Sequence, residues 1–396
     1  MPETMPKPKV SLGKKISNMV HDAPNKIKNS LRATVHRESD KHFIHGEIHR
    51  VNANQAAKKG NHAQAAASNA KSTASYAGKT IIVTGASSGL GFEAAKKLAV
   101  LGTSHLILAV RDEDRGKRAK ERIQEAIHNT KITSRIDTWM LDMTDYDSII
   151  AFTRKINNEL PRLDAAILNA AVMKKQANSS KYGWEETLQV NTLSTILLGL
   201  LLLPKLRATS SVADTDTPVL QFITSALYLR QHFNTNEQQK EAGGLLQSYN
   251  PKNESFSTFA QYGRSKLLMM YAISHLAGLI SRDEVIVNFV SPGMVATDLS
   301  RELEIPLGYL TKPIFSTLFQ RSAEQGSRSY VSGLLQGPDS HGKFWQHDEL
   351  KDFTPNEIKD EQGNNISSQV WQAIVECLQK DIKDEQLQNA IQSLQQ

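Results

Sequence analysis

The chain is poor in cysteine, with one residue, Cys377, among 396. A single thiol cannot form an internal disulfide and excludes metal sites built from several cysteines, so the sequence predicts a reducing compartment and no metal ion. Because Cys377 falls late in an amphipathic segment, a buried structural thiol is favoured over a nucleophile.

Long hydrophobic runs are also missing. No stretch of 18 or more apolar residues occurs, and the N-terminus lacks the uninterrupted apolar core of a secretory signal. The most apolar stretch, residues 193–203, is too short to span a bilayer and is expected to be a helix buried against a sheet. The sequence therefore predicts a cytoplasmic protein.

Residues 1–79 carry the positive charge, with 14 Lys and Arg against 5 Asp and Glu, whereas the rest has 33 basic and 36 acidic residues. The net charge of +6 and the pI of about 9.1 therefore belong to this segment. Because it has few aromatic residues and no apolar pattern long enough to bury a core, residues 1–78 are interpreted as a basic, largely disordered N-terminal extension of one folded domain over residues 79–396.

The role of this extension is open. Ile16, Met19 and Val20 form a weak amphipathic pattern, so peripheral contact with an anionic membrane or a transit function are alternatives to a solvated leader. Binding to nucleic acid is not expected, because no aromatic residues interleave with the lysines and the rest of the chain is slightly acidic.

From residue 79 onward, short β-branched runs alternate with helical segments, a pattern typical of βαβ units and a parallel sheet. The predicted strands cover residues 80–84, 105–110, 135–141, 163–168, 219–224, 285–290 and 343–345. The predicted helices between the first six of them cover residues 90–101, 112–129, 145–160, 183–206 and 256–279. The fold class is therefore α/β, with a doubly wound sheet of about seven strands and a ligand site at the carboxyl ends of the strands.

A glycine-rich turn lies between the first predicted strand and helix. The string runs from Thr84 to Gly91 as TGASSGLG, with Gly85, Gly89 and Gly91 where the chain must turn tightly and approach a pyrophosphate. The helix N-terminus then faces the phosphates. Strand, turn and helix together predict a dinucleotide site that includes Ser87, Ser88 and Leu90 from the same turn.

The end of the second strand indicates which dinucleotide binds. An acid there would hold the ribose hydroxyls of NAD, but the sequence has Val110 followed by Arg111. A guanidinium can pair with the 2′-phosphate of NADP, and Ser87 offers a second contact, so NADP is favoured. The alternative is that Arg111 is a solvated arginine beside Asp112, an N-cap of the next helix.

Tyr262 and Lys266 form a Y-x-x-x-K pair that suits hydride chemistry. Four residues apart on a helix, they share one face, so the ammonium can lower the pKa of the phenol that protonates the substrate oxygen. Ser225 ends the fifth strand, where its hydroxyl can hold the same oxygen.

These motifs resemble the short-chain dehydrogenase/reductase family, which carries T-G-x-x-x-G-x-G and Y-x-x-x-K in this order. The resemblance covers about residues 79–345 and implies a catalytic tetrad of Asn191, Ser225, Tyr262 and Lys266. Tyr262 and Lys266 then also contact the cofactor. The passages from Gln247 to Tyr262 and from His341 to Trp345 resemble a subgroup of fungal, retinol-dehydrogenase-like reductases, many of which act in secondary-metabolite pathways.

The resemblance also implies further cofactor contacts. Asp142 would accept from the adenine amino group, and Met143 would add a backbone contact. Asn169 begins an N-A-A sequence in place of the family's N-A-G and would line the nicotinamide ribose. Val295 would bind the carboxamide through its backbone, and Thr297 would contact a phosphate.

Residues 299–319 are rich in apolar side chains and are interpreted as a substrate lid, which favours a bulky apolar carbonyl or alcohol substrate. The alternative is that these side chains only pack onto the core. An NADP(H)-sensing or scaffolding protein without turnover is the alternative to an enzyme, but no tetrad member is missing. The apolar helices near residues 193–203 and 267–279 offer a homodimer face.

Overall fold

A computed structural model describes residues 76–211, 216–251, 256–293, 295, 322–346, 349–360 and 365–394. Residues 1–75 of the predicted extension, Thr297 and the predicted lid at 299–319 lie outside the described residues. The description begins at Tyr76, whose buried hydroxyl donates to the Val331 carbonyl at 2.8 Å.

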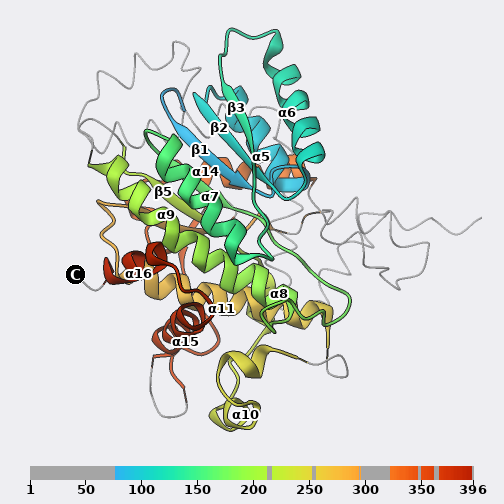
Figure 1. Cartoon of the computed structure of the whole chain (residues 1–396), viewed down its shortest axis with the longest axis vertical. Helices are drawn as coiled ribbons and strands as arrows, with labels where there is room; N and C mark the ends of the chain where they lie inside the picture. The colour runs from blue at the N-terminus through green and yellow to red at the C-terminus, as the bar shows by residue number, and fades with distance from the viewer. Residues whose placement is uncertain are drawn as a thin grey trace, which may run out of the picture.

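The described residues form one eight-stranded sheet in the order β3-β2-β1-β4-β5-β6-β7-β8 (Figure 1). The strands are β1 (Thr80–Thr84), β2 (His105–Val110), β3 (Arg135–Met140), β4 (Ala165–Leu168), β5 (Val219–Ile223), β6 (Ile286–Val290), β7 (Lys343–Gln346) and β8 (Glu349–Asp352). Neighbouring strands from β3 to β7 pair in parallel, so the predicted doubly wound sheet is confirmed. The strand order reverses between β1 and β4, where a ligand is expected.

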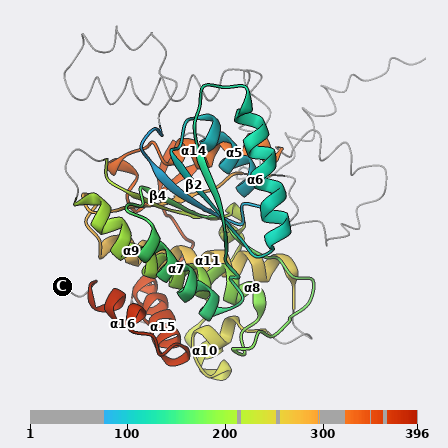
Figure 2. The same cartoon turned by 45° about the horizontal axis from the view of Figure 1, so that its top comes forward.

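Helices cover both faces of the sheet (Figures 1 and 2). One face carries α5 (Gly89–Val100), α6 (Glu113–His128), α13 (Ala323–Gly326) and α14 (Arg328–Gly333). The other carries α7 (Tyr146–Glu159), α8 (Glu186–Leu188), the π-helix η2 (Gln189–Ser194), α9 (Thr195–Ser210) and α11 (Thr258–Gly278). Each layer has its own apolar core.

The C-terminal helices α15 (Ile366–Asp381) and α16 (Glu385–Gln392) form an outer layer on α11 and α9 (Figure 1). Trp371 of α15 lies 5.8 Å from the His275 ring of α11, and Arg207 of α9 donates to the Ser393 carbonyl. Helices α9 and α11 contain the two apolar stretches that the sequence predicts as a homodimer face. Because α15 and α16 pack on these two helices, a homodimer stays a prediction without an assigned surface.

The apolar stretch around residues 193–203 is an interior helix, as the sequence predicts. The continuous helical segment Glu186–Ser210 is long and apolar enough to cross a bilayer, but 94% of its apolar window is buried inside the protein. It packs against the sheet, α7, α11 and α16. This burial accounts for its composition.

The insertion after β5 is folded back onto α11. It contains the 3-10 helices η3 (Ala226–Arg230) and η4 (Leu246–Tyr249) and the short helix α10 (Asn236–Ala242). The Phe233 ring packs against Tyr249 in a tilted arrangement and against Tyr271 edge-to-face, and its backbone N–H donates to the Glu357 carboxylate. Aromatic packing therefore holds the insertion beside the helix that carries Tyr262.

Candidate active site

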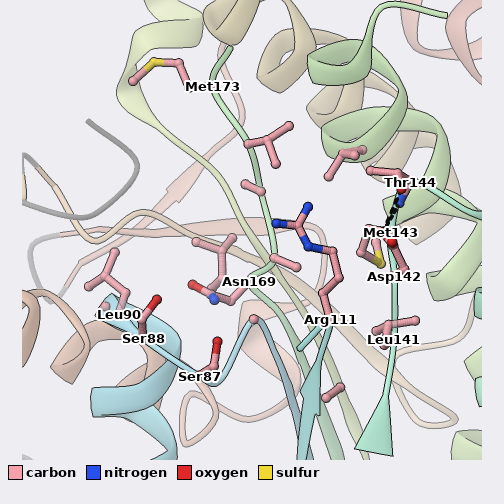
Figure 3. A pocket seen from close by; sticks show the side chains of 18 of the residues that line it. Ser87, Ser88, Leu90, Arg111, Leu141, Asp142, Met143, Thr144, Asn169 and Met173 are labelled. Atoms are coloured by element: carbon pink, nitrogen blue, oxygen red, sulfur yellow. Dashed lines mark hydrogen bonds between the residues drawn. The ribbon is translucent and has the colours of Figure 1, made fainter. Parts of the chain in front are cut away.

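A cavity of about 570 Å³ opens at the carboxyl ends of the strands, beside the β1–β4 switch point. Its lining includes most residues that the sequence predicts for the site: Gly85, Ser87, Ser88, Gly89, Leu90, Arg111, Asp142, Met143, Asn169, Tyr262 and Lys266. Figure 3 shows the turn of Ser87 and Ser88 on one side and Asp142 with Met143 on the other. Segments far apart in sequence thus meet in one concave site.

The glycine-rich turn has the backbone that its glycines predict. Gly85 and Gly89 have φ angles of +65° and +57°, which side-chain-bearing residues rarely adopt. A Cβ on Gly91 would lie 2.5 Å from both Asn169 Nδ2 and the Gly85 carbonyl oxygen. The close approach of α5 to the end of β4 therefore requires glycine at residue 91.

Gly91→Ala is expected to destabilise the protein by about 1–3 kcal/mol, because the added methyl group overpacks the contact with Asn169. The measurement is the free energy of unfolding in urea. Gly278→Ala is the matched control: it also lies in a helix, and a Cβ there would meet no atom within 4 Å. If both variants were equally stable, the close approach at Gly91 would be wrong.

Two arginines face the part of the cavity formed by the end of β2. Arg111 projects into the pocket between Asn169 and Met143 in Figure 3, and Arg115 of α6 also lines it. Asp112 is the N-cap of α6, as predicted, since its carboxylate accepts from the Arg115 N–H at 2.9 Å. The carboxylate of Asp112, the first acid after β2, thus caps the helix terminus, and both guanidinium groups line the cavity.

Asp142 and Met143 follow β3 at the same edge. The Asp142 carboxylate accepts from the backbone N–H and the hydroxyl of Thr144, at 2.9 and 2.8 Å through a single oxygen, Oδ1. These bonds fix the carboxylate at the pocket wall. The orientation suits the acceptor role that the family resemblance implies.

Tyr262 and Lys266 lie one helical turn apart on α11 and are both buried, with 7% and 3% exposure. Burial raises the pKa of Tyr262 to about 12, opposed by a side-chain hydrogen bond with Ser225 that lowers it. Tyr262 is therefore a neutral phenol at physiological pH, and Ser225 is its direct partner. Ser225 also caps η3, accepting from the Leu227 N–H at 3.4 Å.

The Lys266 ammonium lies over the Tyr262 ring, 5.9 Å from its centroid, and donates to the Ile223 carbonyl at 2.8 Å. Burial lowers the pKa of Lys266 to about 7. Its protonation state thus responds to small changes in local charge near neutral pH.

Asn191 supports the site from within the π-helix η2. Its side-chain amide accepts from the Val172 N–H and donates to the Val172 carbonyl, both at 2.9 Å, and also donates to Ser265 Oγ at 3.1 Å. Ser265 lies between Tyr262 and Lys266. Asn191 therefore ties the segment after β4 to the part of α11 that carries Tyr262 and Lys266.

Gln261, the residue before Tyr262, is held from the insertion and from α8. Its amide donates to the buried Glu185 carboxylate at 2.8 Å and to the Tyr249 carbonyl at 3.0 Å. These bonds fix the first turns of α11 and hence the position of Tyr262.

Three site features go beyond or fall outside the sequence prediction. Arg115 was not predicted, although its position four residues after Arg111 on the first helical turn is a usable signal. Tyr330 of α14 also lines the cavity, and no motif surrounds it. Val295 packs against Gly326 of α13, and a Cβ added to Gly326 would lie 2.6 Å from the Val295 side chain. Thr297, two residues further on, lies outside the described residues.

No metal site accompanies this cavity in the part of the chain that the structure describes, where no three His, Cys, Asp or Glu residues cluster. Cys377 is half-buried, its thiol lies 3.7 Å from Asp381 Oδ2, and burial raises its pKa to about 12. This protonated thiol fits a structural role.

Comparison with known proteins supports the resemblance to short-chain dehydrogenases and reductases. A family model for short chain dehydrogenases matches residues 79–213. The short-chain dehydrogenase/reductase phmF of Phaeosphaeria nodorum is 39% identical over 79% of this chain and 90% of its own length. The short-chain dehydrogenase/reductase ffsI of Aspergillus flavipes is 40% identical over 79% of this chain and 89% of its own.

Among solved structures, L-sorbose reductase from Gluconobacter frateurii, complexed with NADPH and L-sorbose, is 18% identical with a TM-score of 0.52. It covers 68% of this chain and 95% of its own. A protein from Mycobacterium paratuberculosis, 20% identical, has the same TM-score and covers 78% and 96% of the two chains. These likenesses show the fold. Sequence identity to the fungal relatives shows the family: the chain is an oxidoreductase of the short-chain dehydrogenase/reductase family, with NAD(P) as cofactor, that acts on CH–OH and C=O groups.

Proposed function

We propose that the protein uses NADP(H) to interconvert a carbonyl and an alcohol on a bulky apolar substrate, in a secondary-metabolite pathway. The observation that carries the cofactor choice is the pair Arg111 and Arg115 at the end of β2, with Asp112 engaged as an N-cap. Two guanidinium groups favour a 2′-phosphate, and the residue directly after β2, where an acid would hold the ribose hydroxyls of NAD, is Arg111. The glycine-rich turn fits the pyrophosphate that NAD and NADP share.

NADP(H), when bound, supplies or accepts the hydride. For reduction, Tyr262 donates its phenolic proton to the substrate oxygen as that oxygen gains negative charge. Ser225 holds the same oxygen through the hydroxyl that contacts Tyr262. Protonated Lys266 stabilises the phenolate that remains, which would otherwise be strongly disfavoured in a buried site. The reverse direction uses the same groups with Tyr262 as base.

The substrate class rests on the apolar residues 299–319 that the sequence predicts as a lid and on the insertion at residues 227–259. Two large apolar side chains of this insertion, Leu229 and Phe259, are 42% and 52% exposed. An apolar ligand that contacts the insertion would remove such side chains from water. The fungal origin of the relatives supports a role in secondary metabolism.

The test is consumption of NADPH or NADH at 340 nm by purified protein with a panel of apolar ketones and aldehydes. We expect turnover with NADPH in preference to NADH. Tight NADPH binding without turnover of any panel member would favour the sensing or scaffolding alternative. No binding of either dinucleotide would refute the proposal.

Cofactor binding is expected to take up protons. The pKa of Lys266 is about 7 in the free protein, so at pH 8 the side chain is mostly neutral. A bound polyanion raises that pKa, so binding adds roughly 0.5–1 proton at pH 8, and affinity falls as the pH rises above 7. Calorimetry in buffers of different ionisation enthalpy measures this uptake. Lys266→Met should abolish it, and an unchanged uptake in that variant would assign the proton to another group.

A further inference from the structure

The side chain of Asn169 is held at both ends. Its Nδ2 donates to the Thr84 carbonyl at 2.8 Å, and its Oδ1 accepts from the Tyr330 hydroxyl at 3.0 Å. The Thr84 hydroxyl in turn accepts from the Asn169 and Ala170 backbone N–H groups, both at 2.9 Å. The Thr84 carbonyl leaves the amide one orientation, because a flip would place the amide oxygen against it, acceptor against acceptor.

This amide lies directly under the glycine-rich turn. A Cβ on Gly85 would lie 3.1 Å from Asn169 Nδ2, and one on Gly91 only 2.5 Å from it. The two glycines therefore pack against the Asn169 amide itself. A change in the position of this amide is transmitted to the turn, since the contact has no spare room.

Tyr330 reaches the amide from the second half of the chain, 161 residues away. It is fully buried, and its backbone carbonyl accepts from Gln221 Nε2 of β5 at 3.0 Å. Burial raises the pKa of Tyr330 well above its ordinary value. Its hydroxyl therefore stays protonated, as a donor to Asn169, throughout the pH range in which Lys266 titrates.

We propose that Tyr330 is a positioning residue of the dinucleotide site: its hydroxyl fixes the Asn169 amide, and the amide supports the glycine-rich turn that contacts the cofactor. This proposal rests on the proposed function in one respect: the cavity must bind a dinucleotide. Asn169 follows β4, two strands away from Arg111 at the end of β2. The Tyr330–Asn169 hydrogen bond should therefore affect the binding of the pyrophosphate, which NADPH and NADH share, and not the binding of the 2′-phosphate.

The test is the dissociation constant of NADPH and of NADH for Tyr330→Phe, measured by fluorescence titration. The variant removes one hydroxyl and leaves Asn169 Oδ1 without its donor. We expect both cofactors to bind about 3- to 10-fold more weakly, by the same factor for each. The kcat at saturating cofactor and its pH profile should stay within twofold of wild type, because Tyr262, Ser225 and Lys266 keep their contacts.

Tyr76→Phe is the matched control. It also removes a buried tyrosine hydroxyl that bonds to α14, at Val331, the residue next to Tyr330, but it does not touch the cavity. We expect it to lower the unfolding temperature while leaving both dissociation constants unchanged. Equal dissociation constants for Tyr330→Phe and Tyr76→Phe would mean that Tyr330 only stabilises the core, and would overturn the proposal.

A double-mutant cycle with Asn169→Ala separates the two roles further. If Tyr330 acts through Asn169, adding Tyr330→Phe to Asn169→Ala should not weaken cofactor binding again, whereas additive losses would contradict the proposal. A wrong prediction of NADP as the cofactor would give a different result. The wild-type protein would then bind NADH and NADPH with similar dissociation constants, and the effect of Tyr330→Phe could still be measured with either cofactor.

Discussion

Tyr262→Phe is expected to lower kcat by about 10²- to 10⁴-fold while leaving the dissociation constant of NADPH within about threefold of wild type. The phenol is the proton donor that we propose, and phenylalanine keeps its shape without the hydroxyl. Single-turnover NADPH oxidation with the best substrate measures the loss.

The control for this variant is Tyr271→Phe. Tyr271 lies on the same helix and is also buried, but its hydroxyl donates to the Glu357 carbonyl, and it does not line the cavity. It should keep near-wild-type turnover at full cofactor occupancy. If Tyr262→Phe retained more than a tenth of the activity, another group would be the proton donor and the assignment of Tyr262 would have to be abandoned.

Arg111→Ala is expected to weaken NADPH binding by about 10- to 100-fold and NADH binding by less than threefold, because a charge-assisted bond to the 2′-phosphate is lost only with NADPH. Calorimetry with both cofactors measures the ratio. Removing Arg115 as well should reduce the preference for NADPH further.

Arg118→Ala provides the comparison, since Arg118 is an exposed arginine of α6 outside the cavity lining. It changes the net charge equally, so it reports the general electrostatic effect. Equal losses for Arg111→Ala and Arg118→Ala, or equal losses for the two cofactors with Arg111→Ala, would refute the recognition of the 2′-phosphate by Arg111.

The parts of the fold that repeat a strong local pattern were predictable from sequence. All seven predicted strands exist. Strands β1, β2, β4, β5 and β6 are buried along almost their whole length, and buried parallel strands are near-continuous apolar runs bounded by turns. The strand β8 was missed, since Glu349–Asp352 is a mostly exposed, polar edge strand stabilised by pairing with β7. The helix α16 was also missed, because this short segment has few apolar residues and is stabilised by packing on α9.

The site also has parts that were predictable from sequence and parts that were not. Glycines at fixed spacing and the Tyr262–Lys266 pair are local signals, so they could be predicted. The contacts of Tyr330 with Asn169, and of Gln261 with Glu185, join segments 161 and 76 residues apart. Nothing in the local sequence of either partner specifies such a pair, and only the tertiary fold brings them together.

The outer layer formed by α15 and α16 also bears on how the protein is made. Helix α11 carries Tyr262 and Lys266 and packs against α15, while α16 packs against α9, so the apolar surfaces of α11 and α9 are covered only after residues 366–392 have left the ribosome. Until then, a nascent chain that already contains Tyr262 and Lys266 still exposes these hydrophobic surfaces. Synthesis that stops before α15 would thus yield a product that contains every proposed catalytic residue yet aggregates or depends on chaperones.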